Sequence, residues 1–423
     1  MDINKLIEKR RKEIIEFTCD LIRKPTVNTP PTGNELPGQI FFGKCCRDTG
    51  LDTHTLYPNE VRGFETSGAY LKDRSFEGRY NVIGMWEGDG NGRSLLLSGH
   101  MDVAPEEPSP WTMCKPFEPA MHEGRLYGRG RADMKSGLAA AFMAVKILKE
   151  SGWSPSGNVL IESVVDEEYA GANGTIASRM AGFNADFAIN AEPTGLALYP
   201  ACVGAAILKI MIKGIAGMPY TGKEIYNPAY GAAKILDILR NYEKHRNTYE
   251  PVHELWKSAP QKRSIIITKV KAGETKEHGQ LGVPIDAWIE VIIQTFPGET
   301  EESSMSKFFD FFDNSIKDIP EFISNKPVVE KEYRYVEPAE CNMDHKGIEV
   351  LKDSFEFAAG KEIEVSGAPF SCDLAAFRKY GNTPAVIFGP SGGNLHAPDE
   401  WVDIESIITA AKVYASMIMN WCG

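Results

Sequence analysis

The sequence lacks the features that define several classes of protein. None of its apolar runs reaches the roughly 20 residues that a membrane-spanning helix needs. The first 24 residues mix apolar and charged side chains and contain no apolar core of a signal peptide. The eight cysteines show neither C-x-x-C spacing nor the density of a disulfide framework. We therefore expect free thiols, a cytoplasmic location and no membrane partner.

An excess of basic charge is also missing. The 423 residues include 58 acidic and 46 basic side chains, which gives a formal net charge of -12. No basic field is available to gather phosphates, so a nucleic-acid partner is not expected. With 43% hydrophobic residues, the composition is that of a globular chain long enough for two domains or one large one.

Apolar segments that alternate with helical patterns indicate an α/β fold. Strands are predicted at residues 81–86, 94–102, 158–165, 186–190 and 385–388. Helices are predicted at residues 136–150, 174–180, 346–359, 373–380 and 404–421. Continuously apolar strands separated by helices are typical of a mostly parallel sheet with helices on both faces.

The pattern changes near residue 206. Strands predicted at 206–213, 264–270 and 287–295 alternate more evenly between apolar and polar residues, and helices are predicted at 228–244 and 303–317. This order favours an inserted α+β domain with an antiparallel sheet. The earlier pattern returns near residue 328. We therefore predict one domain built from residues 1–205 and 328–423, and an inserted domain at 206–327.

Histidines and acidic residues lie where the predicted strands end. His100 and Asp102 close the apolar run 95–102, and their i, i+2 spacing places both side chains on one face. Glu167 and Glu168 follow the strand that ends at residue 165, and Glu192 follows the strand at 186–190. Parallel strands bring their carboxyl ends to one rim of the sheet, where ligands bind.

Two further residues reach the same rim from loops. His396 lies in a glycine-rich loop after the strand at 385–388, and Asp133 precedes the helix at 136–150. An aspartate before a helix is most often a cap. Two imidazoles and three carboxylates at one rim suit two divalent ions, with Zn²⁺ expected first and Co²⁺ or Mn²⁺ as alternatives.

Beyond these residues, several motifs make the chain resemble the co-catalytic zinc amidohydrolases that include acetylornithine deacetylase, succinyl-diaminopimelate desuccinylase, aminoacylase-1 and carboxypeptidase G. The motifs lie at residues 81–84, 98–103, 111, 116–117, 128–137, 166–168, 191–194 and 396–400. The segments 366–369 and 388–390 are most similar to the acetylornithine-deacetylase-like branch.

The resemblance implies a role for each matching residue. Asp133 would bridge two metal ions. His100 and Glu192 would complete the shell of one ion, and Glu168 and His396 the shell of the other. Glu167 would act as the general base, and Asp102 would orient His100 through the second ring nitrogen. The family also implies a small amide substrate, a homodimer, and a lid or dimerisation role for the insert.

The insert departs from the family pattern. The histidine that usually follows Lys-Gly in the lid is missing after Lys213-Gly214, and the usual lid arginine falls near Gln294. Among the remaining histidines, His278 lies nearest this altered stretch. Candidate substrate-binding residues are Gln294, Asp373 and Asn394, although Asp373 fits a helix cap equally well.

Three functions remain open from the sequence. The first is an N-deacylase, or dipeptidase-like hydrolase, of a linear amide. The second is a deformylase or cyclic-amide hydrolase acting on a substrate without a carboxylate. The third is a metal-binding protein without catalysis. If a basic group does grip a substrate carboxylate, Arg246 and Arg263 are the candidates.

Overall fold

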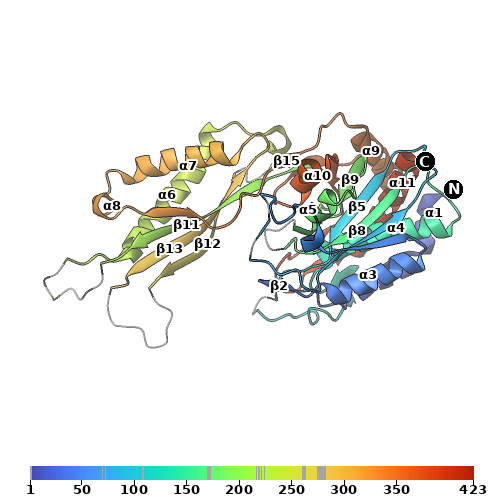
Figure 1. Ribbon diagram of the computed structural model, residues 1–423, viewed down its shortest axis with the longest axis horizontal. Coiled ribbons are helices and arrows are strands. Elements are labelled where there is room, and N and C mark those ends of the chain that lie inside the picture. Colours follow the sequence, from blue (N-terminus) through green and yellow to red (C-terminus); the bar gives the residue numbers. More distant parts are fainter. Residues whose placement is uncertain are drawn as a thin grey trace. The chain divides into compact units, whose positions relative to one another are not determined.

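The computed structural model describes residues 2–68, 70–71, 73–106, 109–168, 173–215, 217, 220, 222, 224–259, 263–273 and 283–423. The chain divides into two compact units (Figure 1). The first unit comprises Met1–Ala201, Glu340–Ala368 and Cys372–Gly423, and the second comprises Cys202–Ala339 and Pro369–Ser371. Among the described helices, none is both long and apolar enough to cross a bilayer.

A mixed sheet forms the centre of the first unit. Its strand order is β15-β10-β17-β9-β5-β8-β4-β3, and β16 pairs with β10. The strands are β3 (Asp52–Leu56), β4 (Asn81–Trp86), β5 (Leu95–His100), β8 (Val159–Val164), β9 (Phe187–Asn190), β10 (Leu198–Cys202), β15 (Ala339–Glu340), β16 (Val365–Ala368) and β17 (Ala385–Ile387).

The direction of the strands differs between the centre and the flanks of this sheet. β17, β9, β5 and β8 are parallel, whereas β3, β4 and β10 run antiparallel to their neighbours. The predicted α/β class is therefore confirmed, with the parallel part confined to the four central strands. Apolar composition did not reveal the antiparallel strands, because a strand covered on both faces is apolar in either direction.

Helices cover both faces of this sheet. On β8, Val159 and Ile161 belong to the core cluster that includes α4 (Ser136–Glu150), α9 (Lys346–Ala359) and α11 (Ile404–Cys422). The alternating side chain of Glu162 faces the opposite side, where it pairs at 2.6 Å with Arg179 of α5 (Asn173–Met180). Successive side chains of a strand point to opposite faces, so this alternation places the two helix layers.

The parallel register brings the ends of the four central strands to one edge. His100 at the end of β5 is paired with Val164 of β8, while Asn190 of β9 is paired with Ser98 of β5 and Ile387 of β17. The segments that follow these strands carry the predicted site residues. The rim expected from the sequence is therefore present in the first unit.

The second unit contains an antiparallel sheet ordered β12-β13-β11-β14. Its strands are β11 (Gly204–Lys213), β12 (Ile265–Ala272), β13 (Asp286–Thr295) and β14 (Val328–Lys331). Side chains of α6 (Pro228–Tyr249) and α7 (Glu301–Ile316) share a core with β11 and β13. This is the α+β insert that the even alternation predicts. Because β14 pairs with β11, the unit continues past residue 327 to Ala339.

Some elements escaped the sequence analysis. Helix α3 (Leu36–Asp48) begins within a stretch rich in proline, asparagine and threonine that reads as a loop. Its buried face includes Phe42 and Cys46, which join the main core cluster. Proline is tolerated in a first helical turn, so Pro37 does not prevent this helix from forming.

Gly137 generates a prediction about the packing that supports the rim. A Cβ atom at this position in α4 would lie 1.9 Å from the carbonyl oxygen of Ala191, next to Glu192. Since backbone would have to move, Gly137→Ala should lower the free energy of unfolding by about 1–3 kcal/mol or more, measured by urea denaturation. Gly43→Ala in α3 is the matched control, because its Cβ would meet its nearest neighbour at 3.4 Å. Equal stability of the two variants would contradict the expected clash.

Candidate metal centre

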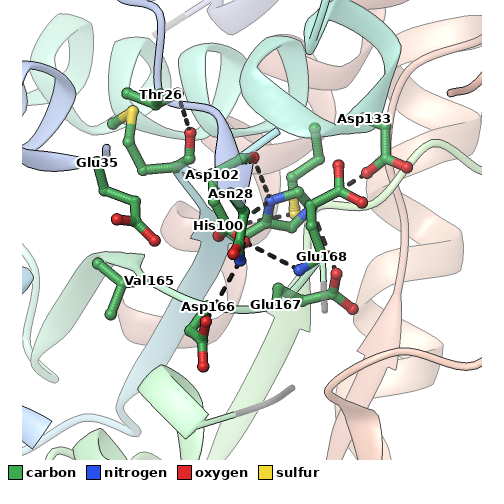
Figure 2. A network of polar contacts seen from close by, with 12 residues as sticks. Thr26, Asn28, Glu35, His100, Asp102, Asp133, Val165, Asp166, Glu167 and Glu168 are labelled. Carbon is green, nitrogen blue, oxygen red and sulfur yellow. Dashed lines mark hydrogen bonds and ion pairs between the residues drawn. The ribbon is translucent and has the colours of Figure 1, made fainter. Parts of the chain in front are cut away.

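Asp133 lies between the two predicted histidine ligands. Its Oδ1 is 3.1 Å from His100 Nε2, and its Oδ2 is 3.2 Å from His396 Nε2. Figure 2 shows Asp133 beside His100, with Glu167 and Glu168 nearby. One carboxylate thus presents one oxygen to each imidazole, which is the arrangement expected of a group that bridges two ions.

The backbone before α4 places Asp133 in this position. Residues Arg131–Lys135 form a tight irregular turn in which Asp133 adopts an extended conformation. Within the described chain, no side chain caps α4. The capping role considered from the sequence therefore does not apply to Asp133.

The predicted glutamates complete two groups of possible ligands. His396 Nε2 lies 2.8 Å from Glu168 Oε2, and His100 Nε2 lies 3.7 Å from Glu192 Oε1 and 4.0 Å from Glu167 Oε2. Two groups of three residues each place their ligand atoms within 4.8 Å of one another. The first group is His100, Glu167 and Glu192, and the second is His100, Asp133 and Glu168. Both sets have the donor types that suit a divalent cation.

The electrostatics of these carboxylates favour an added positive charge. Burial, together with the charge of nearby Asp133, raises the pKa of Glu168 and of Glu192 to about 7. Burial also raises the pKa of Glu167 well above its ordinary value. Burial alone would raise the pKa of Asp133, but hydrogen bonds with His100 and His396 outweigh it and lower that pKa. A divalent cation would stabilise all of these carboxylates in their charged form.

Asp102 and Asn28 support His100 from behind. The Nδ1 atom of His100 lies 2.9 Å from the main-chain oxygen of Asp102, whose carboxylate Oδ1 is farther away at 3.7 Å. Asp102 Oδ2 accepts hydrogen bonds from Asn28 Nδ2 at 2.7 Å and from the amide of Glu168 at 2.9 Å. A proton on Nδ1 donated to that main-chain oxygen leaves Nε2 free to bind metal. Asp102 therefore links the ends of β5 and β8.

Asp166 has a different role from the two glutamates that follow it. Its buried carboxylate accepts hydrogen bonds from Arg74 Nε at 2.8 Å, Arg79 Nη2 at 2.9 Å and Asn173 Nδ2 at 2.8 Å. Its φ of 67° is in the left-handed region, which turns the chain sharply between β8 and Glu167. Arg74 and Arg79 thus neutralise Asp166. The two acids that follow it, Glu167 and Glu168, face the site.

Sequence reasoning missed Asn28, Arg74 and Arg79. Asn28 contacts both Asp102 and Asp166 (Figure 2). Arg79 also pairs with buried Glu35. The two arginines lie in a stretch without a recognisable motif, so no local signal marked them. The only available hint was that three adjacent acids after a buried strand need positive partners.

The three candidate substrate-binding residues have structural contacts. Gln294 accepts a hydrogen bond from the amide of Ser264 at 3.1 Å and donates one to the main-chain oxygen of Pro369 at 3.0 Å. Asn394 donates to the main-chain oxygen of Asp399 at 3.2 Å.

Asp373 does not cap α10 (Leu374–Gly381) through its side chain in the described chain, and it accepts a hydrogen bond from Thr175. Burial is the main cause of the raised pKa of Glu167 and of Glu192, and the negative charge of Asp373, which lies near both, contributes to it. His278 and part of the altered lid stretch, at residues 216, 218–219 and 281–282, lie outside the described residues.

Comparison with known proteins supports the chemistry of this centre. Residues 96–420 match peptidase family M20/M25/M40. The chain is 25% identical to an N-formyl-4-amino-5-aminomethyl-2-methylpyrimidine deformylase of Bacillus subtilis, over 99% of this chain and 97% of that protein. It is 28% identical to a probable succinyl-diaminopimelate desuccinylase of Staphylococcus aureus, over 77% of this chain and 83% of that protein.

Solved structures show the same fold at low identity. A dipeptidase from Saccharomyces cerevisiae gives a TM-score of 0.77 at 15% identity, covering 100% of this chain and 98% of that one. A dinuclear metal-binding peptidase of the M20 family from Bacillus subtilis gives a TM-score of 0.61 at 15% identity, covering 98% of this chain and 99% of that one. The chain belongs to peptidase family M20/M25/M40, and it is a metal-dependent hydrolase of amide C–N bonds.

Proposed function

We propose that this enzyme removes a small acyl group, with formyl as the first candidate, from an amine that carries no carboxylate beside the scissile amide. Two deformylases, at 25% and 22% identity, align with 99% and 98% of this chain, whereas the desuccinylase of Staphylococcus aureus aligns with 77%. The two deformylases, which align with nearly the whole chain, therefore favour a small acyl group.

The observation that carries the proposal is the state of the possible carboxylate-binding groups in the second unit. Gln294 stands where the family's lid arginine is expected and is neutral, and its amide is engaged in the two contacts described above. A neutral amide cannot replace a bidentate, charge-assisted guanidinium contact.

Arg246 and Arg263 are not free to substitute for that arginine. Both are buried, and both pair with Glu250 and Glu299: Arg263 Nη1 lies 3.0 and 2.9 Å from these glutamates, and Arg246 lies 3.4 and 3.3 Å away. Taking either arginine to a substrate would remove one of the two arginine partners of each mostly buried glutamate, which costs free energy. These contacts support a substrate without a carboxylate at that position.

The roles proposed for the site residues follow the resemblance and the distances. Asp133 would bridge two ions, with His100 and Glu192 on one of them and Glu168 and His396 on the other. Divalent ions bound there would supply Lewis-acid polarisation of the substrate carbonyl and would make water more acidic. Glu167 then takes a proton from the attacking water and delivers it to the amine nitrogen as the C–N bond breaks. Asp102 keeps His100 in its orientation.

The remaining features of the proposal are less specific to the site. Zinc is the metal proposed first, with cobalt or manganese as alternatives, because imidazole and carboxylate ligands suit all three. None of the eight cysteines, all of which lie in the described chain, forms a disulfide, and several are buried, which favours a reducing cytoplasm. By its position in the chain, the second unit is proposed as the lid or dimerisation domain of a homodimer.

Glu167→Gln tests the assignment of the base. The variant should keep close to two bound ions per chain, because Glu167 is not among the proposed ligands, yet should lose at least about 100-fold in kcat. Metal analysis of the purified protein and initial rates on a confirmed substrate measure the two effects. Full activity would refute the role of Glu167. Loss of one ion would instead make it a ligand, as its distance from His100 also permits.

A matched pair of substrates tests the proposed specificity. N-formylbenzylamine and N-formylphenylglycine differ by one carboxylate next to the scissile amide, so their ratio of kcat/KM isolates its effect. We expect the amine without the carboxylate to react faster, and N-acetylornithine to stay below roughly 10⁵ M⁻¹s⁻¹. Glu167→Gln assayed in parallel measures the background from any contaminating enzyme. Faster turnover of N-formylphenylglycine or efficient deacetylation of N-acetylornithine would overturn the specificity but leave the metal chemistry standing.

A further inference from the structure

Glu400 is a buried carboxylate with an unusual set of partners. Its Oε2 accepts hydrogen bonds from Arg129 Nη1 and from the amide of Gly130, each at 2.9 Å. Its Oε1 accepts from the amide of Ala132 at 2.9 Å and from the amide of Asp133 at 3.2 Å. Three of the four donors are consecutive or nearly consecutive main-chain groups of the loop that presents Asp133, here called the Asp133 loop (residues 128–135).

Glu400 belongs to a second loop that also bears a metal ligand. It lies four residues after His396, in the segment 391–400, here called the His396 loop. The main chains of the two loops are also joined. The amide of Gly128 donates to the main-chain oxygen of Glu400 at 3.0 Å. Directly beside them, Trp401 of β19 (Trp401–Asp403) pairs with Tyr127 of β7 (Arg125–Tyr127). Glu400 therefore connects the segment that holds one proposed ligand to the segment that holds another.

The His396 loop has a constrained shape of its own. Asn394, His396 and Asp399 have φ values of 57°, 58° and 56°, in the left-handed region that residues other than glycine seldom adopt. Asp399 Oδ1 accepts the amide of Thr112 at 2.8 Å and that of Met113 at 2.9 Å. Such conformations persist where surrounding contacts fix them. The direction of His396 therefore depends on anchors at both ends of its loop.

We propose that Glu400 is a positioning residue that sets Asp133 relative to His396, so that both metal positions depend on it together. Each Glu400 oxygen already accepts two hydrogen bonds, and its charge is balanced by Arg129, so it is assigned no ligand role. Hydrogen bonds to the amide of Asp133 and its neighbours hold the bridging carboxylate between the two imidazoles. The inference rests on the metal ligands proposed above, since the coupling follows from Asp133 serving both ions.

Glu400→Gln tests this role with little change in size. The amide group of glutamine is a donor, so two of the four N–H groups would face another donor in place of an acceptor. Hydrogen exchange of the metal-depleted full chain should become faster in the peptide covering residues 128–135. Titration of the same protein with Co²⁺, followed by visible absorption, should show both ions bound about 10- to 100-fold more weakly, the range typical when a group supporting a metal ligand is removed.

Two further variants separate positioning from general stability. Glu405→Gln, an exposed change in α11 that loses only a surface pair with Arg11, should leave exchange and Co²⁺ binding as in the wild type. Glu400→Asp keeps the charge beside Arg129 but is one methylene shorter, so its Co²⁺ affinity should fall between the wild type and Glu400→Gln. It also keeps the test valid if the glutamine variant folds poorly.

The outcomes distinguish this inference from the proposed function. Unchanged exchange in residues 128–135, unchanged Co²⁺ affinity in both Glu400 variants, or weakening of one ion alone would overturn the positioning role. If the wild type itself binds fewer than two ions, the ligand assignment fails and the coupling fails with it. In that case the exchange measurement still reports whether Glu400 holds the Asp133 loop.

Discussion

The rest of the first unit is arranged around the crowding of negative charge at one edge of its sheet. The mostly buried carboxylates of Asp133, Glu167, Glu168 and Glu192 lie around buried His100 and half-exposed His396. Charged carboxylates in such surroundings are costly unless something positive is near. Burial raises the pKa of all three glutamates, so their charged forms are favoured by added positive charge nearby. The site is therefore built for cations that the chain itself does not provide.

Two acids next to this site that do not face it, Asp166 and Glu400, are neutralised within the protein. Asp166 is held by Arg74 and Arg79, and Glu400 is held by Arg129 and by main-chain amides. These contacts do two things at once: they remove charge that would otherwise add to the repulsion, and they fix the loops from which Glu167, Asp133 and His396 project. Neutralisation and positioning thus come from the same hydrogen bonds.

In the second unit, the buried arginines pair with acids of the same unit and stabilise it. Arg246 and Arg263 share Glu250 and Glu299 in a buried ion-pair network, and Gln294 joins main-chain groups of the same unit. Under the proposed function, the first unit would carry out the hydrolysis and the second unit would set the substrate preference.

The sequence by itself determined the α/β class, the inserted α+β unit, and the positions of His100, Asp133, Glu167, Glu168, Glu192 and His396 at element ends. It did so because apolar periodicity marks where strands end, and parallel strands end at one edge. Only the tertiary structure showed how Asp166 is turned away from the site, since that depends on the left-handed turn at Asp166 and on arginines about 90 residues earlier in the chain. Two further features could not be predicted from the sequence: the antiparallel flanks of the sheet and the contact from Glu400 to the Asp133 loop. Strand direction and partners distant in the chain leave no local pattern.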